Sequence, residues 1–335
     1  MFRSPRRVLT SLAAAGVAVS LTLTGCSSSD TTADTDETTT TASTGFPRTV
    51  EHFRGVANID AQPQRIVTLD NSYADAVLLL ESPLVGYVDY REQGLPDYLG
   101  DARTEYAADA VSVGKVSNAS LEKVAELQPD LILSAEVRDG KNYEALSALA
   151  PTVLSQSTGP TWKDNIRLVA RALGKEYLAE QKIGEYEARA KAIGDEINAK
   201  ANNPTVSVVR FAGEPTARLY RTTSFSGIVL DDAGLARPAS QGPDPADAGS
   251  IMNAISPERI NEADADVIFV ATYEDPAGKS LEAAQAFLQN PLWGTLKGRI
   301  VNVDDAMWMT PVSVQGAHEI LDDLAEAFGV DPHNS

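Results

Sequence analysis

"GKEYLAEQKIGEYEARAKAIGDEINAKA" (residues 174–201) is the stretch around which the rest of the chain is organised. Apolar or small residues recur in it at intervals of three to five positions, and charged residues fill most of the positions between. This period predicts one amphipathic helix, about 40 Å long at 1.5 Å per residue. A helix of that length predicts a rigid strut between two lobes, with small lobe motions rather than wide closure. The repeating positions are Leu178, Ile183, Tyr186, Ala190, Ile193 and Ile197.

Strand-like segments lie on both sides of this helix and alternate with helical patterns such as "YADAVLLLE" (73–81). Such alternation is typical of mostly parallel sheets, so the chain is predicted to have an α/β fold of two Rossmann-like lobes. We place the N-terminal lobe at 46–160, a connecting helical region at 161–203 and the C-terminal lobe at 204–330. The predicted strands are 65–69, 84–88, 130–134 and 152–156, then 205–211, 266–271 and 299–303.

An internal repeat supports two lobes of one design. "SLEKVAELQPDLIL" (120–133) and "SPERINEADADVIF" (256–269) align without gaps, and Ser, Glu, Glu, Asp and Ile coincide. Each copy predicts a serine N-cap, a short helix, an aspartate turn and a buried strand. Pro257 fits the first helical position of the second copy. Chance similarity between two ordinary αβ units is the alternative.

The N-terminal residues are typical of an export signal. Arg3, Arg6 and Arg7 precede a 17-residue run of apolar and small residues that ends at Thr24. The sequence "LTGC" (23–26) then resembles the lipobox of bacterial lipoproteins, which implies removal of a signal peptide at 1–25 and lipidation of Cys26. A buried structural cysteine beside an uncleaved helix is the alternative, and the arginine pair leaves Sec and twin-arginine export open.

A polar segment follows the lipobox. Twelve of the 18 residues at 27–44 are Ser or Thr and four are acidic, so residues 26–45 are predicted to be a disordered tether. The protein would then lie at the cell membrane, anchored through its lipid alone and facing the extracytoplasmic side. The formal net charge of −19 disfavours nucleic acid as a partner.

Few residues are suited to direct metal binding or catalysis. The three histidines, His52, His318 and His333, form no H-x-x-x-H pair, so we expect no directly bound metal. No G-x-S-x-G elbow accompanies a histidine that could act as base, so an enzyme is not predicted. "DDAGL" and "VDDAM" contain paired acids of the kind that glycosidases use, so a secreted hydrolase is kept as an alternative. A structural lipoprotein without a ligand is another.

The lipobox, the tether, the repeated α/β lobes and the long helix together resemble the substrate-binding lipoproteins of ABC importers for ferric siderophores, cobalamin and haem. Three further segments are similar to this family: "PQRIVTLDNSYADAVLLLE" (63–81), "RLYRTTSFSGIVLDDAGL" (218–235) and "VNVDDAMWM" (301–309). The ferric-siderophore branch is the most similar; haem and cobalamin stay as alternatives. The resemblance implies an interlobe cleft, a ferric siderophore as ligand, no permanently bound cofactor, delivery to a permease, and a monomer.

The resemblance also implies which residues act. Glu122 and Glu258, the matched glutamates of the repeat, would dock on arginines of the permease; first-turn helix stabilisation is the alternative reading. Arg210, at a strand end, and Arg91 would hold ligand oxygens, unless they form surface salt bridges. Aromatic faces would contact the chelate, unless they pack in the core. The full set of predicted ligand contacts is Arg210, Arg91, Trp308, Tyr90, Tyr273, Tyr220, Arg221 and Tyr73. Few arginines and several aromatics favour a hydroxamate or mixed-ligand chelate over a tris-catecholate.

Overall fold

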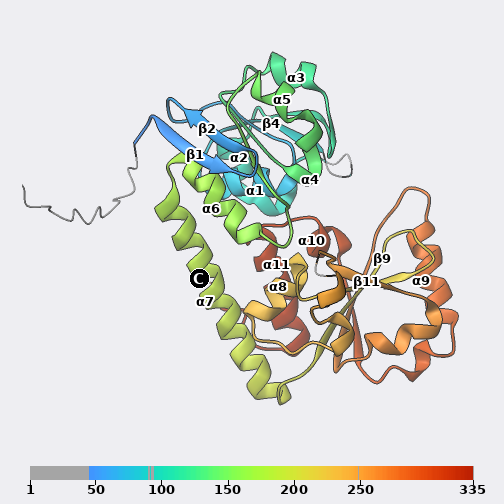
Figure 1. Cartoon of the computed structure of the whole chain (residues 1–335). Helices are drawn as coiled ribbons and strands as arrows, with labels where there is room; N and C mark the ends of the chain where they lie inside the picture. Colours follow the sequence, from blue (N-terminus) through green and yellow to red (C-terminus); the bar gives the residue numbers. More distant parts are fainter. Residues whose placement is uncertain (1–44, 90, 92–93, 248, 335) are drawn as a thin grey trace, which may run out of the picture. The chain divides into compact units, whose positions relative to one another are not determined.

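The computed structural model describes residues 45–334, apart from positions 90, 92, 93 and 248. The predicted signal peptide, Cys26, the tether up to residue 44 and Tyr90 therefore lie outside the described residues. Two α/β lobes and one long helix, α7, make up the described part (Figure 1). Within that part, no helix combines the length and hydrophobicity needed to cross a bilayer.

The N-terminal lobe is built on a six-stranded sheet with the order β6-β5-β4-β3-β7-β8. Its strands run parallel except β6, which pairs with β5 in the antiparallel sense. Four of these strands were predicted, while β5 and β6, whose residues are mostly half-buried or exposed, were not. A separate antiparallel hairpin, β1–β2, precedes the sheet. The strands are β1 Arg48–His52, β2 Gly55–Ile59, β3 Ile66–Thr68, β4 Leu84–Asp89, β5 Val111–Lys115, β6 Asn118–Ala119, β7 Leu131–Ala135 and β8 Thr152–Ser155.

The C-terminal lobe is built on a five-stranded sheet with the order β11-β10-β9-β12-β13. The three predicted strands, β9, β12 and β13, run parallel to one another. Two antiparallel strands that were not predicted, β10 and β11, extend the sheet beyond β9. The strands are β9 Val206–Phe211, β10 Ala217–Tyr220, β11 Met252–Ile255, β12 Val267–Thr272 and β13 Arg299–Val303.

Helices cover both sheets and connect their strands. The α-helices of the N-terminal lobe and the connection are α1 Asn71–Leu79, α2 Gly100–Tyr106, α3 Leu121–Glu126, α4 Glu136–Asp139, α5 Tyr143–Ser147, α6 Trp162–Leu173 and α7 Glu176–Ala201. Those of the C-terminal lobe are α8 Phe225–Asp232, α9 Lys279–Gln289, α10 Asp305–Met309 and α11 Val314–Phe328. Short 3₁₀ helices are η1 Asp97–Leu99, η2 Gly140–Asn142, η3 Ala239–Gln241, η4 Pro245–Asp247, η5 Pro257–Ala263 and η6 Trp293–Thr295.

The long helix α7 confirms the strut that the apolar period predicted. Of the six repeating positions, five are buried and Leu178 is partly buried against the same core. The helix packs on α6 at one end and on α8 and α11 of the C-terminal lobe further along. Gly194 permits the close approach to α8, because a Cβ there would lie 1.6 Å from the carbonyl oxygen of Ala233.

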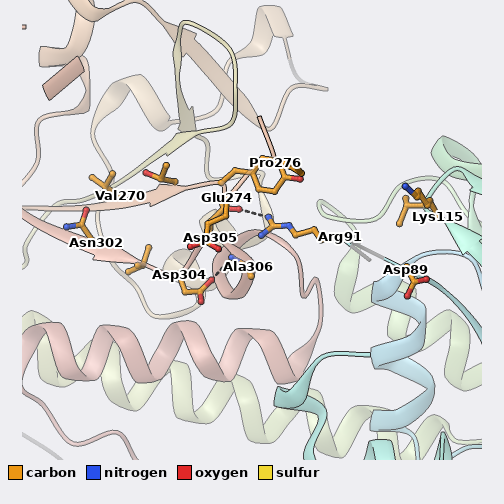
Figure 2. Close-up of a pocket in the computed structure, with 14 residues that line it drawn as sticks. Asp89, Arg91, Lys115, Val270, Glu274, Pro276, Asn302, Asp304, Asp305 and Ala306 are labelled. Carbon is orange, nitrogen blue, oxygen red and sulfur yellow. Dashed lines mark hydrogen bonds and ion pairs between the residues drawn. The ribbon is translucent and has the colours of Figure 1, made fainter. Parts of the chain in front are cut away.

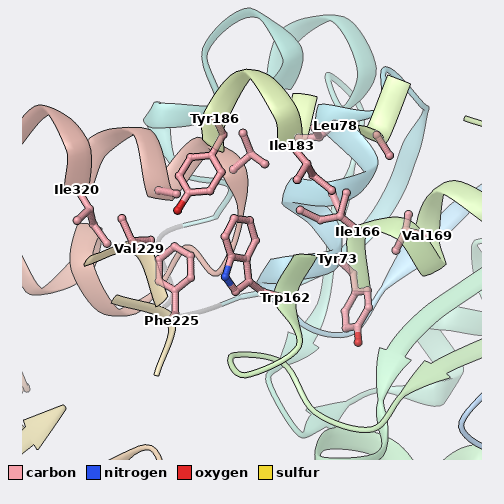
Figure 3. Packing of buried hydrophobic residues seen from close by; sticks show 14 of the residues in the cluster. Tyr73, Leu78, Trp162, Ile166, Val169, Ile183, Tyr186, Phe225, Val229 and Ile320 are labelled. Atoms are coloured by element: carbon pink, nitrogen blue, oxygen red, sulfur yellow. The ribbon is translucent and has the colours of Figure 1, made fainter. Parts of the chain in front are cut away.

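One hydrophobic core runs through both lobes along this helical side. Trp162 of α6 lies between Tyr186 of α7 and Phe225 of α8, with ring centroids 5.4 and 5.5 Å away (Figure 3). Lys163 adds a polar connection, since its Nζ donates to Asp232 at 2.8 Å and to Glu187 at 2.7 Å. Opening the lobes widely would break these buried contacts, so a small lobe motion remains the prediction.

The two repeat copies have related roles but differ at their helices. Asp130 accepts hydrogen bonds from the backbone of Gln64 and Arg65 just before β3, and Asp266 accepts from the backbone of Thr205 just before β9. Each aspartate thus ties its own strand to the neighbouring parallel strand. The first helix is α3, capped by Ser120, which accepts from the Lys123 amide. The second is the 3₁₀ helix η5, in which Ser256 occupies the predicted N-cap position but makes no side-chain capping bond.

Candidate ligand-binding cleft

A cleft of about 1010 Å³ lies between the two lobes. The carboxyl ends of parallel strands from both sheets meet there: β4 and β5 on one side, β12 and β13 on the other. This is the edge at which open α/β sheets bind ligands. Figure 2 shows Arg91 reaching from the N-terminal lobe toward Asp305 of the C-terminal lobe. The lining residues are Asp89, Arg91, Lys115, Val116, Val270, Thr272, Tyr273, Glu274, Pro276, Asn302, Val303, Asp304, Asp305 and Ala306.

Asp305, the first residue of α10, holds two arginines. Arg210 of β9 donates from Nε to Oδ1 at 2.6 Å and from Nη2 to Oδ2 at 3.0 Å. Arg91 donates from Nη2 to the same Oδ2 at 2.5 Å. The Asp305 side chain is only 2 % exposed, so this carboxylate lies buried between two guanidinium groups and forms charge-assisted hydrogen bonds with both.

Aromatic side chains complete this cluster. The guanidinium carbon of Arg91 lies 4.4 Å from the ring centroid of Tyr273, and that of Arg210 lies 5.9 Å from it. Both distances are within the range of cation–π attraction. The hydroxyl of Tyr220 accepts a hydrogen bond from Arg210 Nη1 at 3.0 Å. Four predicted residues, Arg91, Arg210, Tyr220 and Tyr273, are therefore gathered in one place.

Among the described residues that line the cleft, acidic side chains outnumber basic ones. Besides Asp305, the lining includes Asp89, Glu274 and Asp304, against Arg91 and Lys115. Asp304 also caps α10, because its Oδ1 accepts from the Ala306 amide at 2.6 Å. A ligand with several uncompensated negative charges would meet repulsion here.

Three predicted contact residues lie elsewhere. Trp308 is fully buried, stacks on Phe269 at 4.8 Å and donates from Nε1 to Asp323 at 2.6 Å. The polar residues in the surrounding sequence "DDAMWMT" (304–310) would predict a loop, but residues 305–309 form α10 and the indole lies in the core. Tyr73 is also fully buried, with its hydroxyl bonded to Ser155 Oγ at 2.5 Å, and this burial raises the pKa of Tyr73.

Arg221 is likewise buried rather than in the cleft. Its Nε donates to Asn253 Oδ1 at 3.0 Å and its Nη1 donates to the carbonyl of Asp247 at 2.9 Å. These contacts hold the loop before β11 in place. A structural role therefore explains Arg221, Trp308 and Tyr73.

The sequence interpretation missed the acidic half of the cleft and Lys115. Asp304 and Asp305 directly follow the predicted strand β13. Their position at the carboxyl end of a parallel strand could have indicated that they lie in the cleft. Lys115 and Asp89 end β5 and β4. The paired acids of "VDDAM" had been considered as a glycosidase signature and as part of the family resemblance, but not as cleft residues.

Histidines do not contribute to the cleft lining. His52 lies in β1, His333 near the C-terminus bonds to Glu196, and His318 lies in α11. Burial, reinforced by the nearby Arg189 guanidinium, lowers the pKa of His318 to about 4. Among the described residues, no group of three or more His, Cys, Asp or Glu side chains is placed to hold a metal ion.

Both predicted docking glutamates lie on the surface. Glu122 is exposed in the first turn of α3, and Glu258 is exposed in the first turn of η5. A hydrogen bond from the Ser256 side chain lowers the pKa of Glu258. Glu258 is therefore ionised at neutral pH.

Comparison with known sequences finds one family and several relatives. The pattern of the periplasmic binding protein family matches residues 66–298. "Probable siderophore-binding lipoprotein YfiY" of Bacillus subtilis is 35 % identical over 321 residues, covering 92 % of this chain and 94 % of the relative. "Fe(3+) dicitrate-binding periplasmic protein FecB" of Escherichia coli is 26 % identical, covering 86 % of this chain and 92 % of the relative.

Solved structures with the same fold are also similar. The crystal structure of Staphylococcus aureus SirA complexed with staphyloferrin B aligns with a TM-score of 0.76 at 27 % identity, covering 85 % of this chain and 100 % of SirA. Holo-ViuP aligns with a TM-score of 0.67 at 22 % identity, covering 84 % of this chain and 95 % of ViuP. The second likeness concerns the fold alone.

Proposed function

The chain belongs to the periplasmic binding protein family, and on that basis we propose that it captures a ferric siderophore between its lobes and delivers it to an ABC permease for iron uptake. The family was expected from the sequence, and the expectation is confirmed. Relatives named for siderophore or ferric citrate binding support the ligand class.

One observation carries this proposal: the interlobe cleft has a cation and an aromatic face at its centre. Arg91 over Tyr273 offers hydrogen-bond donors and a flat surface to a chelate whose outer atoms are oxygens and ring carbons. The volume of about 1010 Å³ is at the upper end of the range for small-molecule sites, as a bulky metal chelate requires. We propose that Arg91 and Tyr273 contact the ligand directly. Arg210 and Tyr220 lie next to them and hold them in place.

Delivery would use the two exposed glutamates. Glu122 and Glu258 occupy matched positions of the internal repeat, one on each lobe. Two exposed carboxylates, one on each lobe, suit a permease surface that offers two cationic sites. We propose that this pair sets the orientation in which the protein docks.

Attachment and assembly complete the proposal. Lipidation of Cys26 would hold the protein at the extracytoplasmic side of the cell membrane, with residues 26–45 as tether. We propose a monomer that binds and releases its ligand without catalysing a reaction, as the family's description as binding proteins suggests.

The test is a titration of residues 46–335, in which tryptophan fluorescence reports binding. The ligands are ferrioxamine B, ferric citrate, ferric enterobactin, haem and cobalamin. We expect saturable quenching by a ferric chelate at sub-micromolar concentration, weakened at least about tenfold in Arg91→Gln. Arg259→Gln is the control, because Arg259 is an exposed arginine paired only with Glu262 on its own helix. Saturable binding of haem or cobalamin alone would reassign the ligand, and binding of none would refute the proposal.

A further inference from the structure

We propose that Asp305 and an oxyanion of the ligand compete for the Arg91 guanidinium, so that Asp305 determines which ferric chelates the cleft accepts. This inference rests on the proposed function and adds a substrate class to it. The favoured ligands are ferric chelates of low overall charge that present one carboxylate or comparable oxyanion to Arg91.

The contact between Arg91 and Asp305 crosses the cleft. Arg91 follows β4 of the N-terminal lobe, and Asp305 follows β13 of the C-terminal lobe. In the described part of the chain, other contacts of this kind lie outside the cleft lining: Ser313 donates to Asp75 of the N-terminal lobe, and Lys163 of the connecting helix α6 donates to Asp232 of the C-terminal lobe. The Arg91–Asp305 pair therefore occupies the position in which a bound chelate would contact both lobes.

The two arginines on Asp305 are not equivalent. Arg210 is 8 % exposed, lies within a central strand and holds Asp305 through two hydrogen bonds, with a third to Tyr220. Arg91 contacts Asp305 through a hydrogen bond to Oδ2, as far as the described residues show, and lies in a loop with a left-handed φ of 63° that is uncommon for arginine. Arg91 is thus the partner that can exchange.

Exchange at Arg91 leaves no buried charge without a partner. When Arg91 turns to a ligand oxyanion, both oxygens of Asp305 still accept from Arg210. The guanidinium itself exchanges one carboxylate for another and keeps its place over Tyr273. Arg210 is accordingly a positioning residue, and Arg91 contacts the ligand.

The same arrangement limits the charge of the ligand. Once displaced from Arg91, Asp305 stays in the cleft wall beside Asp304 and Glu274. A single oxyanion can be compensated by Arg91, whereas a tris-catecholate chelate brings more negative charge than the lining cations neutralise. The cleft therefore selects for one well-placed oxyanion and against high net charge.

The experiment compares Asp305→Asn with Asp304→Asn in residues 46–335. Each substitution removes one carboxylate from the cleft lining, but only Asp305 contacts the arginines, and asparagine at 304 preserves the helix cap. The probe is ferrioxamine B succinylated at its free amine, a hydroxamate chelate with one free carboxylate and a single negative charge, with the iron-free chelator as blank. We expect the Kd for this chelate to fall by about tenfold or more in Asp305→Asn and by less than about threefold in Asp304→Asn. The gain must vanish when Arg91→Gln is combined with Asp305→Asn.

The outcomes separate the two proposals. An equal gain in both variants, or no gain in Asp305→Asn while the wild type binds ferric chelates, overturns the competition and leaves the proposed function intact. Failure of every variant to bind any ferric chelate refutes the proposed function, and the competition with it. The pair is also tested without any chelate: Asp305→Asn should shift the urea midpoint less in an Arg91→Gln background than alone, and additive shifts overturn the interlobe contact.

Discussion

Gly194 of α7 faces the carbonyl oxygen of Ala233 so closely that a Cβ at position 194 would lie 1.6 Å from that oxygen. Ala233 follows the last turn of α8, so this glycine sets how near the strut lies to the C-terminal lobe. Helix propensity alone would favour alanine at this position. The close approach therefore outweighs the helical preference.

Gly194→Ala should lower the free energy of unfolding by about 1–3 kcal/mol, because α7 or α8 must move to admit the methyl group. Gly184, in the same helix, has no atom near its Cβ position, so Gly184→Ala should stabilise by roughly 0.5–1 kcal/mol. Urea unfolding of both variants measures the effect. Equal changes in the two variants would contradict the close packing.

Two buried groups should give stability an opposing pH dependence. Burial raises the pKa of Asp75 to about 7 despite hydrogen bonds from Ser313 and Tyr98, so its stabilising contribution, full below pH about 4, is lost as the pH rises to 7. The lowered pKa of His318 acts in the other direction: its contribution, full above pH 6.5, is lost as the pH falls to about 4.

Asp75→Asn should therefore become more stable relative to the wild type as the pH rises from 4 to 7. In the wild type, the free energy of unfolding falls as the pH rises, because the buried Asp75 carboxyl ionises less readily than it does in the unfolded chain. Asparagine does not ionise, so the variant does not lose this free energy. Urea unfolding of both proteins across pH 4–8 gives the difference directly. A difference that stays constant over this range would show that Asp75 titrates as an exposed aspartate does.

Trp308→Phe should separate core packing from ligand contact. The substitution keeps an aromatic ring beside Phe269 and removes the hydrogen bond to Asp323, for an expected loss of about 1–3 kcal/mol in unfolding free energy. Affinity for the ferric chelate should change less than about threefold. A large loss of affinity for the chelate without a change in stability would show that Trp308 contacts the ligand.

Charge reversal at the docking glutamates should affect transport without affecting binding. Glu122→Arg combined with Glu258→Arg should lower uptake through the cognate permease at least about tenfold, because it would place cations against cations. The Kd for the ferric chelate should be unchanged. Glu51→Arg, at an exposed position of the β1–β2 hairpin, is the control. Normal uptake by the double variant would show that neither glutamate is needed for docking on the permease.

The shared core predicts a small change in shape on binding. A compact body of about 290 residues has a radius of gyration of roughly 19 Å. Small-angle scattering with and without saturating ligand should give radii that differ by a small fraction of that value. A large contraction would contradict the rigid connection through Trp162, Tyr186 and Phe225.

Elements with a clear apolar pattern in the sequence could be predicted, and strands without one could not. The helix α7 and seven strands have continuous or periodic apolar residues, and all eight were found. The strands β5, β10 and β11 ("VSVGK", "ARLY" and "MNAI") have no such run, so their composition does not distinguish them from loops.

The candidate site was predictable only in part, for a similar reason. A residue's position at the end of a parallel strand can be inferred, and this located Arg210 and Tyr273. The pairing of Arg91 with Asp305 depends on how two lobes meet, which no local pattern encodes. Trp308 shows the converse: its polar neighbours predicted a loop, and tertiary packing buried the ring.

The core that runs through α6, α7, α8 and α11 has a consequence for cooperativity. The described residues, from 45 to 334, belong to one compact unit although they contain two separate sheets. Either half expressed alone would leave Trp162 or Phe225 without its partners and expose an apolar helical face to water. The halves are therefore duplicated in design but not autonomous in folding, and heat should melt them in a single transition.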